Sequence, residues 1–185
     1  DKGWDEVQID AANDALIFTA RPTDTAPLSL AHQTCLPANL ASGDIVETCP
    51  AGEDAMAHLS THIVTHGGAA LIIDYGHGEA GAGDSFQALE KHKYVDPLAA
   101  PGLADLTAHV NFPLLAQIAQ THGLNAMPVS QQGAFLEALG LNIRAQQLMQ
   151  ARAGREKQIN EERLRLAAPQ HMGALFKVLG VAHPA

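Results

Sequence analysis

Residues 67–77 read Gly-Gly-Ala-Ala-Leu-Ile-Ile-Asp-Tyr-Gly-His, a glycine pair, a short apolar run and a polar end. The preceding stretch, Glu53–His66, carries apolar side chains at every third or fourth position, which predicts an amphipathic helix that ends at Gly67. Ala69–Ile73 is apolar on both faces, as is typical of a strand inside a parallel sheet. A helix, a glycine stop and a buried strand predict an α/β fold.

The amino-terminal region predicts a separate, peripheral structure. Gly3–Ala20 alternates weakly and has a turn signal at Asn13-Asp14, so we expect a β-hairpin. Arg21–Ser42 contains three prolines and no clean period, which indicates a long loop. Asp44–Thr48 is expected to form a short strand. Residues 1–50 are therefore predicted to lie outside the core, and residues 51–185 to form it.

The carboxy-terminal region predicts alternating helices and strands. The expected helices are Ser85–His92 with Asp84 as its cap, Asn111–Gly123, Gln132–Leu139, and a longer region, Leu141–Arg165, broken near Gly154. The expected strands are Asn125–Ser130, in which Pro128 indicates a bend, and Ala174–Ala182.

Charge and composition narrow the classes of partner. The formal net charge is −9, which disfavours nucleic acid and anionic membranes as partners. Nine acids and no Lys or Arg lie between Arg21 and Lys91, whereas Arg144–Lys177 carries seven bases and three acids. An acidic solvated face explains the first region, and an acidic cleft for a cationic substrate is the functional alternative.

Cysteine usage and apolar runs indicate the compartment. Cys35 and Cys49 are the only cysteines, which fits a reducing compartment better than a disulfide framework. No apolar run approaches the roughly 20 residues of a membrane span. The chain opens at Asp1 without a leader-like segment, so we expect a piece of a longer protein.

Polar residues follow the apolar run directly. In open α/β sheets, ligands bind outside the carboxyl ends of the strands, so Asp74, Tyr75 and His77 are candidate acid, base or hydrogen-bonding groups. Asp105 and His109 precede a predicted helix in a polar stretch and are further candidates, although capping would also explain Asp105. No GxSxG motif accompanies these residues, which argues against a hydrolase triad.

Two other motifs have competing explanations. Gly76, Gly78 and Gly81 match GxGxxG after a strand, the dinucleotide fingerprint, but no strand with an acidic tip follows about 20 residues on. A strand-to-helix loop without a ligand is the alternative. His58, His62 and His66 recur every four residues on one helix; without a further carboxylate or thiol ligand they indicate a solvated polar face, and no metal site is predicted.

Six segments in order resemble one family, the MidA-type S-adenosylmethionine-dependent methyltransferases. These are Leu71–His77, Gly83–Ala88 with His92, Pro101–Phe112, Gln132–Leu136, Leu139–Arg144 and Met172–Val178. The resemblance implies a class I, Rossmann-like α/β fold with a mostly parallel sheet. Ala69–Asp74 would be its fifth strand, and Asn125–Ser130 and Ala174–Ala182 its antiparallel sixth and last strands.

The resemblance also implies that the chain is the carboxy-terminal half of one methyltransferase domain. In the family, three features precede the position of Trp4: the glycine-rich cofactor loop, the acidic ribose-binding position and the Asn-Glu motif. We therefore expect S-adenosylmethionine to bind outside this chain. The missing amino-terminal half is then an expected partner. The cofactor-binding residues of this chain are unknown at this stage.

The implied activity is methyl transfer to a protein arginine, because mitochondrial relatives act in complex I assembly in this way. On this resemblance, pocket residues would be Asp74, Tyr75, His77, Asp105 and His109. The expected location is the bacterial cytoplasm, or the mitochondrial matrix in a eukaryote. The alternatives are an NAD(P)-type Rossmann protein that uses the three loop glycines and a non-catalytic assembly module that docks through an unpaired strand edge.

Overall fold

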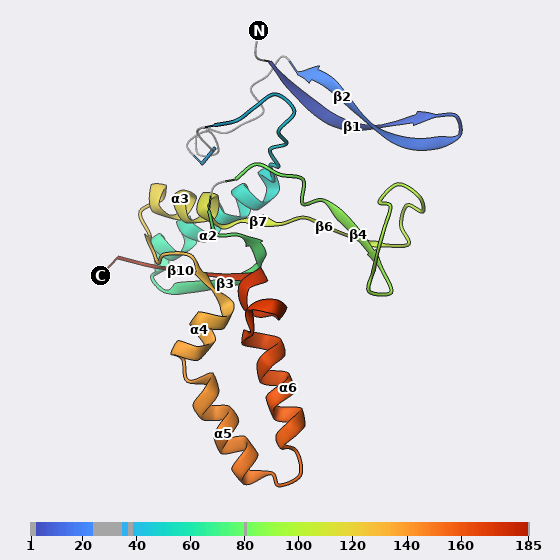
Figure 1. Cartoon of the computed structure of the whole chain (residues 1–185). Coiled ribbons are helices and arrows are strands. Elements are labelled where there is room, and N and C mark those ends of the chain that lie inside the picture. Colours follow the sequence, from blue (N-terminus) through green and yellow to red (C-terminus); the bar gives the residue numbers. More distant parts are fainter. Residues whose placement is uncertain (1–2, 24–34, 37–38, 80, 185) are drawn as a thin grey trace. The chain divides into compact units, whose positions relative to one another are not determined.

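The computed structural model describes residues 3–23, 35–36, 39–79 and 81–184 (Figure 1). The chain divides into two units: Asp1–Thr48 with Gly81–His109, and Cys49–Ala80 with Val110–Ala185. Within the described residues, no helix is both long and apolar enough to cross a membrane.

The first unit contains a hairpin and a small antiparallel sheet. Strands β1 (Trp4–Ala12) and β2 (Ala15–Thr23) pair from Trp4↔Thr23 to Ala12↔Ala15. Asn13 and Asp14 have φ values of 51° and 59°, as a two-residue hairpin turn requires. The hairpin prediction is confirmed. The second sheet has the order β5-β4-β6, from strands β4 (Gln87–Glu90), β5 (Lys93–Val95) and β6 (Asp105–Thr107).

Two predictions in this unit are wrong. Asp44–Thr48 pairs with no strand among the described residues; its Ile45 carbonyl oxygen accepts a hydrogen bond from Gly83 N at 2.8 Å instead. Ser85–His92 is not a helix, because Gln87–Glu90 pairs on both sides within the small sheet. Most of the predicted Arg21–Ser42 loop lies outside the described residues, and its first three residues belong to β2.

The second unit is built on strand β3 (Ala69–His77), which confirms the predicted strand and extends it to His77. The sheet order is β7-β3-β10-β8, with β9 also on β10. The last strand, β10 (Phe176–Ala182), runs antiparallel to β3 over seven residue pairs, and this prediction is confirmed. Strand β7 (Val110–Asn111) is parallel to β3 but pairs only at Gly76 and His77.

The predicted strand Asn125–Ser130 is divided in two. Strands β8 (Asn125–Ala126) and β9 (Ser130–Gln131) flank Pro128, which has no N–H to donate to a ladder. Both are antiparallel to β10 and therefore run in the direction of β3, so the antiparallel orientation expected for this strand is wrong.

The core of this unit is formed by helix α2 (Pro50–His66), helix α3 (Phe112–Thr121) and strand β10. Met56, Ile63, Phe112 and Leu114 are buried, and Leu179 and Val181 of β10 are 0% and 2% exposed. Both helices were predicted, and Asn111 caps α3 by accepting from Leu114 N at 3.2 Å. Helix α2 begins three residues earlier than expected, at Pro50, a residue favoured in a first turn.

Three further helices follow. Helix α4 (Gln132–Ala138) ends before Gly140, and α5 (Leu141–Ala151) and α6 (Glu156–Ala167) are separated at Gly154, whose φ is 87°. At the predicted break the chain reverses its direction, so that α5 and α6 lie side by side as a helical hairpin (Figure 1). A short π-helical turn, η1 (Pro169–Gly173), leads into β10.

Gly76 is required by the approach of β7 to β3. A Cβ at this position would overlap the Val110 carbonyl oxygen and lie 3.0 Å from two ring carbons of Phe112. We expect Gly76→Ala to lower the free energy of unfolding by about 1–3 kcal/mol, because neither the backbone nor the fully buried Phe112 ring can move freely. Urea denaturation measures it. Gly83→Ala is the control, since its added Cβ meets nothing within 4 Å; equal losses in the two variants would contradict the steric explanation.

Candidate functional site

The carboxyl end of β3 holds three of the residues predicted from the sequence. Asp74, Tyr75 and His77 are all half-buried in the last four residues of the strand. An Asp74 carboxylate oxygen accepts from the Tyr75 N–H at 2.8 Å, and the Tyr75 and Phe176 rings meet edge to face at 5.8 Å. Tyr75 and His77 alternate with Asp74 along the strand, so they lie on the opposite face of the sheet.

Lys177 is a residue at this strand end that the sequence analysis missed. It lies opposite Asp74 in the register of β10 and β3, and paired residues share a face of the sheet. Its Nζ donates to the carbonyl oxygens of Ala174 and Leu175 at 2.6 and 3.1 Å. Partial burial lowers the pKa of Lys177 from its usual value. Its position opposite Asp74 depends on how β10 pairs with β3, which the sequence of neither strand specifies.

The GxGxxG motif is explained by packing. Gly76 allows β7 to approach, and a Cβ at Gly78 would meet the Lys177 side chain at 3.3 Å. Phosphate binding by this motif needs a helix N-terminus directly after the loop. The loop is instead followed by strand β4, and Asp84 accepts from Phe86 N at 3.1 Å rather than capping a helix. The geometry therefore does not support the dinucleotide-binding alternative.

In the first unit, a hydrogen-bonded cluster connects three segments that are far apart in sequence. Glu47 accepts from the Ser85 backbone N–H at 3.0 Å and from the Ser85 hydroxyl, and Ser85 Oγ accepts from the His109 backbone N–H at 2.8 Å. His109 was predicted as a site residue, whereas Glu47 and Ser85 were not. No local motif could have found them, because the contacts join residues 24 and 38 positions apart.

The remaining predicted residue, Asp105, is exposed on β6 opposite Leu89. The structure thus places the five candidates in two sets: Asp74, Tyr75 and His77 together in the second unit, and Asp105 and His109 in the first. Their assignment as pocket residues stays a prediction.

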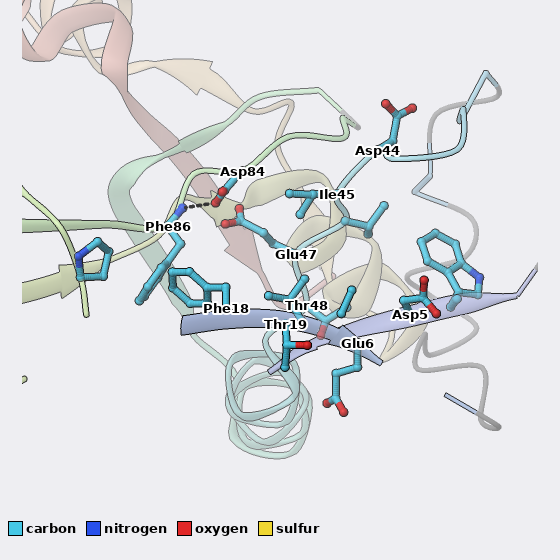
Figure 2. A pocket seen from close by; sticks show the side chains of 15 residues that line it. Asp5, Glu6, Phe18, Thr19, Asp44, Ile45, Glu47, Thr48, Asp84 and Phe86 are labelled. Carbon is cyan, nitrogen blue, oxygen red and sulfur yellow. Dashed lines mark hydrogen bonds between the residues drawn. The ribbon is translucent and has the colours of Figure 1, made fainter. Parts of the chain in front are cut away.

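A pocket of about 820 Å³ lies beside the Glu47 cluster in the first unit (Figure 2). The hairpin forms one wall and the segment around Asp44–Thr48 another, with Asp84, Phe86 and Pro97 completing it. Phe18 of the hairpin meets Phe86 edge to face, with ring centroids 6.3 Å apart. The carboxyl groups of Glu47 and Asp84 are drawn toward the same part of the pocket in Figure 2.

The histidine row on α2 shows no metal-binding arrangement in the part of the chain that the structure describes. The His62 and His66 rings are 4.7 Å apart, but no set of three His, Cys, Asp or Glu side chains gathers there or elsewhere among the described residues.

Comparison with known proteins matches residues 1–130 to the model of a family described as "Putative S-adenosyl-L-methionine-dependent methyltransferase". The human mitochondrial protein arginine methyltransferase NDUFAF7 is 34% identical over 183 residues, covering 95% of this chain and 39% of that protein. Its Drosophila melanogaster homolog is 36% identical over 193 residues, covering 98% of the chain and 42% of that protein. The chain thus spans about two-fifths of the length of these relatives.

Two solved structures from Burkholderia thailandensis share the fold. One is an uncharacterised protein with a TM-score of 0.79 and 22% identity, and the other, bound to S-adenosyl-homocysteine, has a TM-score of 0.78 and 24% identity. Each match covers 98% of this chain, and 49% and 48% of the solved chains. The likeness confirms the predicted class I methyltransferase-like α/β fold.

The hydrogen bonds of the Glu47–Ser85 cluster are expected to stabilise the first unit. Ser85→Ala removes the hydroxyl that donates to Glu47 and accepts from the His109 N–H, and it leaves the backbone donor to Glu47 in place, so we expect a loss of about 1–3 kcal/mol in unfolding free energy, measured by urea denaturation. In the control Thr65→Ala, an exposed hydroxyl bonded to its own helix is lost and no buried partner is left, so little change is expected. A Ser85→Ala variant as stable as the control would contradict a structural role for the cluster.

Proposed function

Since the chain belongs to this family of S-adenosyl-L-methionine-dependent methyltransferases, we propose that the protein transfers a methyl group from S-adenosylmethionine to an arginine side chain of a protein substrate. The observation that carries the proposal is the family match over residues 1–130, together with relatives that are named protein arginine methyltransferases. The strand end at Asp74–His77 supports it, because ligands of open α/β sheets lie at that end.

The described residues do not by themselves fit the cofactor. A nucleoside-containing cofactor is held by a glycine-rich turn between a strand and a helix, and the Gly76–Gly83 loop leads instead to β4. We place the cofactor loop in a further part of the domain, outside this chain. The match to only 39% of the human relative supports that placement.

Strand β3 offers the surface on which such a part would dock. Among the described residues, Ala69–Asp74 is paired on one side only, by β10. Leu71 and Ile73 remain 54% and 41% exposed, although they lie in the middle of the strand. An unpaired strand beside exposed apolar side chains is a surface that another strand and its covering helix would bury. The amino-terminal half of the domain is the partner we propose for it.

At the reacting centre, the chain's own groups would orient the arginine and take up its proton. Asp74 can hold a guanidinium through charge-assisted hydrogen bonds, and Tyr75 and His77, on the other face at the same strand end, can act as hydrogen-bonding or basic groups. Asp105 and His109 are proposed as further pocket residues. Because direct methyl transfer depends mainly on in-line positioning, these roles are chiefly ones of placement.

The relatives with mitochondrial names support a location in the mitochondrial matrix if the source is eukaryotic; in a bacterium we propose the cytoplasm.

We expect His77→Asn and Asp74→Asn to lower kcat for arginine methylation by about 100-fold each if they deprotonate or hold the substrate. The assay is radiolabelled methyl transfer by the complete enzyme. His62→Asn, the same change at an exposed histidine of α2, is the matched control and should leave kcat unchanged. Wild-type kcat in both strand-end variants would remove these residues from the reacting centre while leaving the enzyme assignment intact.

The docking surface on β3 is tested by mixing the chain with the separately produced amino-terminal half of its domain. We expect Leu71→Asp to weaken the association about tenfold or more, because it places a charge on apolar surface that the complex buries. Leu139→Asp is the control, since Leu139 is 70% exposed on the loop after α4. Sedimentation equilibrium gives both dissociation constants. Equal constants for the two variants would show that the partner docks elsewhere.

A further inference from the structure

The β1–β2 hairpin has one apolar face that the described residues leave largely exposed. Residues at alternate positions share a face, and this face carries Val7, Ile9, Leu16 and Phe18. Their exposed fractions are 55%, 59%, 39% and 47%. The opposite face carries the Asp10–Arg21 ion pair and the polar residues Glu6, Gln8 and Thr19, together with Ile17, which is 42% exposed. Isolated two-stranded hairpins are at best marginally stable in water, so an open apolar face favours an occupant.

The pocket beside this face has a charge of one sign. Five of its fifteen lining residues are acidic, namely Asp5, Glu6, Asp44, Glu47 and Asp84, and none is Lys, Arg or His. Such a lining repels anions and attracts a cation, and partial enclosure by apolar walls strengthens the attraction. The occupant should therefore carry positive charge on an otherwise apolar or extended segment.

The carboxylates of the pocket differ in how many hydrogen bonds they already accept within the protein. Glu47 is occupied by Ser85, and Asp44 and Asp84 each accept one backbone N–H, from Ala41 and Phe86. A carboxylate accepts about four hydrogen bonds, so Asp84 retains capacity for a ligand. Asp5 is exposed on the wall of the pocket. Asp5 and Asp84 therefore line the same pocket as the Phe18 and Phe86 rings.

That combination suits arginine better than lysine. A guanidinium is planar, stacks on aromatic faces and forms two parallel hydrogen bonds with a carboxylate, whereas an ammonium is a compact, strongly hydrated charge. Phe18 and Phe86 present half-exposed rings in the same pocket as Asp5 and Asp84. The volume of about 820 Å³ lies within the range of roughly 300–1,000 Å³ of small-ligand pockets, enough for a short segment rather than a folded surface.

We propose that this pocket is a docking site for an extended, arginine-bearing segment of the protein substrate. The site lies wholly in the first unit, on residues other than those proposed to act at the reacting centre. The choice of partner rests on the proposed arginine methylation, whereas the acidic and aromatic chemistry of the pocket stands without it.

Trp4 makes the proposal directly measurable. It is the only tryptophan of the chain and lines the pocket, so a bound peptide should change its fluorescence. The probe is a synthetic nonapeptide with two arginines among alanine and serine residues, titrated into the 185-residue chain. The comparison peptide has lysines at the same positions. We expect saturable binding of the arginine peptide, weaker binding of the lysine peptide, and loss of affinity as salt is raised.

The variant Asp5→Asn with Asp84→Asn removes two charges and preserves size, and asparagine can still accept from Phe86 N. We expect about tenfold weaker binding of the arginine peptide, or ~1.4 kcal/mol. The matched control, Asp54→Asn with Glu137→Gln, removes two exposed charges from α2 and α4 and should bind as the unaltered chain does. Circular dichroism verifies that each variant is folded.

The outcomes separate docking from catalysis. Absence of arginine-peptide binding, or equal weakening in the two double variants, overturns the docking site. Sedimentation tests the other occupant: self-association that the pocket variant alone abolishes would show that a second copy fills the pocket, which also overturns the proposal. Peptide binding without methyl transfer by the complete enzyme would refute the proposed function and keep the site. Methyl transfer with unaltered KM in the pocket variant would refute the site and keep the function.

Discussion

The ladder between β10 and β3 is the constraint on which the second unit depends. Seven residue pairs, from Phe176↔Tyr75 to Ala182↔Ala69, join the end of the chain to a strand about 100 residues earlier. The pairing fixes the register of β3 and therefore which of its residues face the helices. Leu179 and Val181, which pair with Ile72 and Ala70, are buried in a strand that contacts α3, so the first half of β3 lies on the packed core and its polar end lies beyond it.

Sequence patterns predicted the elements that local chemistry determines. Asn13 and Asp14 accept positive φ at low cost, so the hairpin could be located from two residues. The helix ends could also be located, because they lie at glycines with positive φ, namely Gly67, Gly140 and Gly154. The failed predictions are segments of five and eight residues. Ser85–His92 and Asp44–Thr48 are too short for periodicity to decide, and long-range contacts determine their structure.

The candidate site residues also divide into those that local sequence reveals and those that depend on long-range contacts. Asp74, Tyr75 and His77 could be proposed because a strand end is visible in the sequence. Glu47 and Ser85 could not, because their bond depends on two loops meeting in space. Lys177 was hidden for a third reason: its position opposite Asp74 follows from the register of an antiparallel ladder, which no single strand sequence specifies.

The two open apolar surfaces differ in the partner that they suit. Burying one large aliphatic side chain contributes about 1.5–3 kcal/mol, a large share of the ~5–15 kcal/mol by which domains are stable. On β3, exposed Leu71 and Ile73 lie in Ala69–Asp74, whose second edge pairs with no strand among the described residues and can be satisfied by another strand. On the hairpin, exposed Val7 and Phe18 line a pocket with five acidic residues, a lining that favours a cationic segment. The first surface therefore suits a permanent partner within the fold, and the second an exchangeable one.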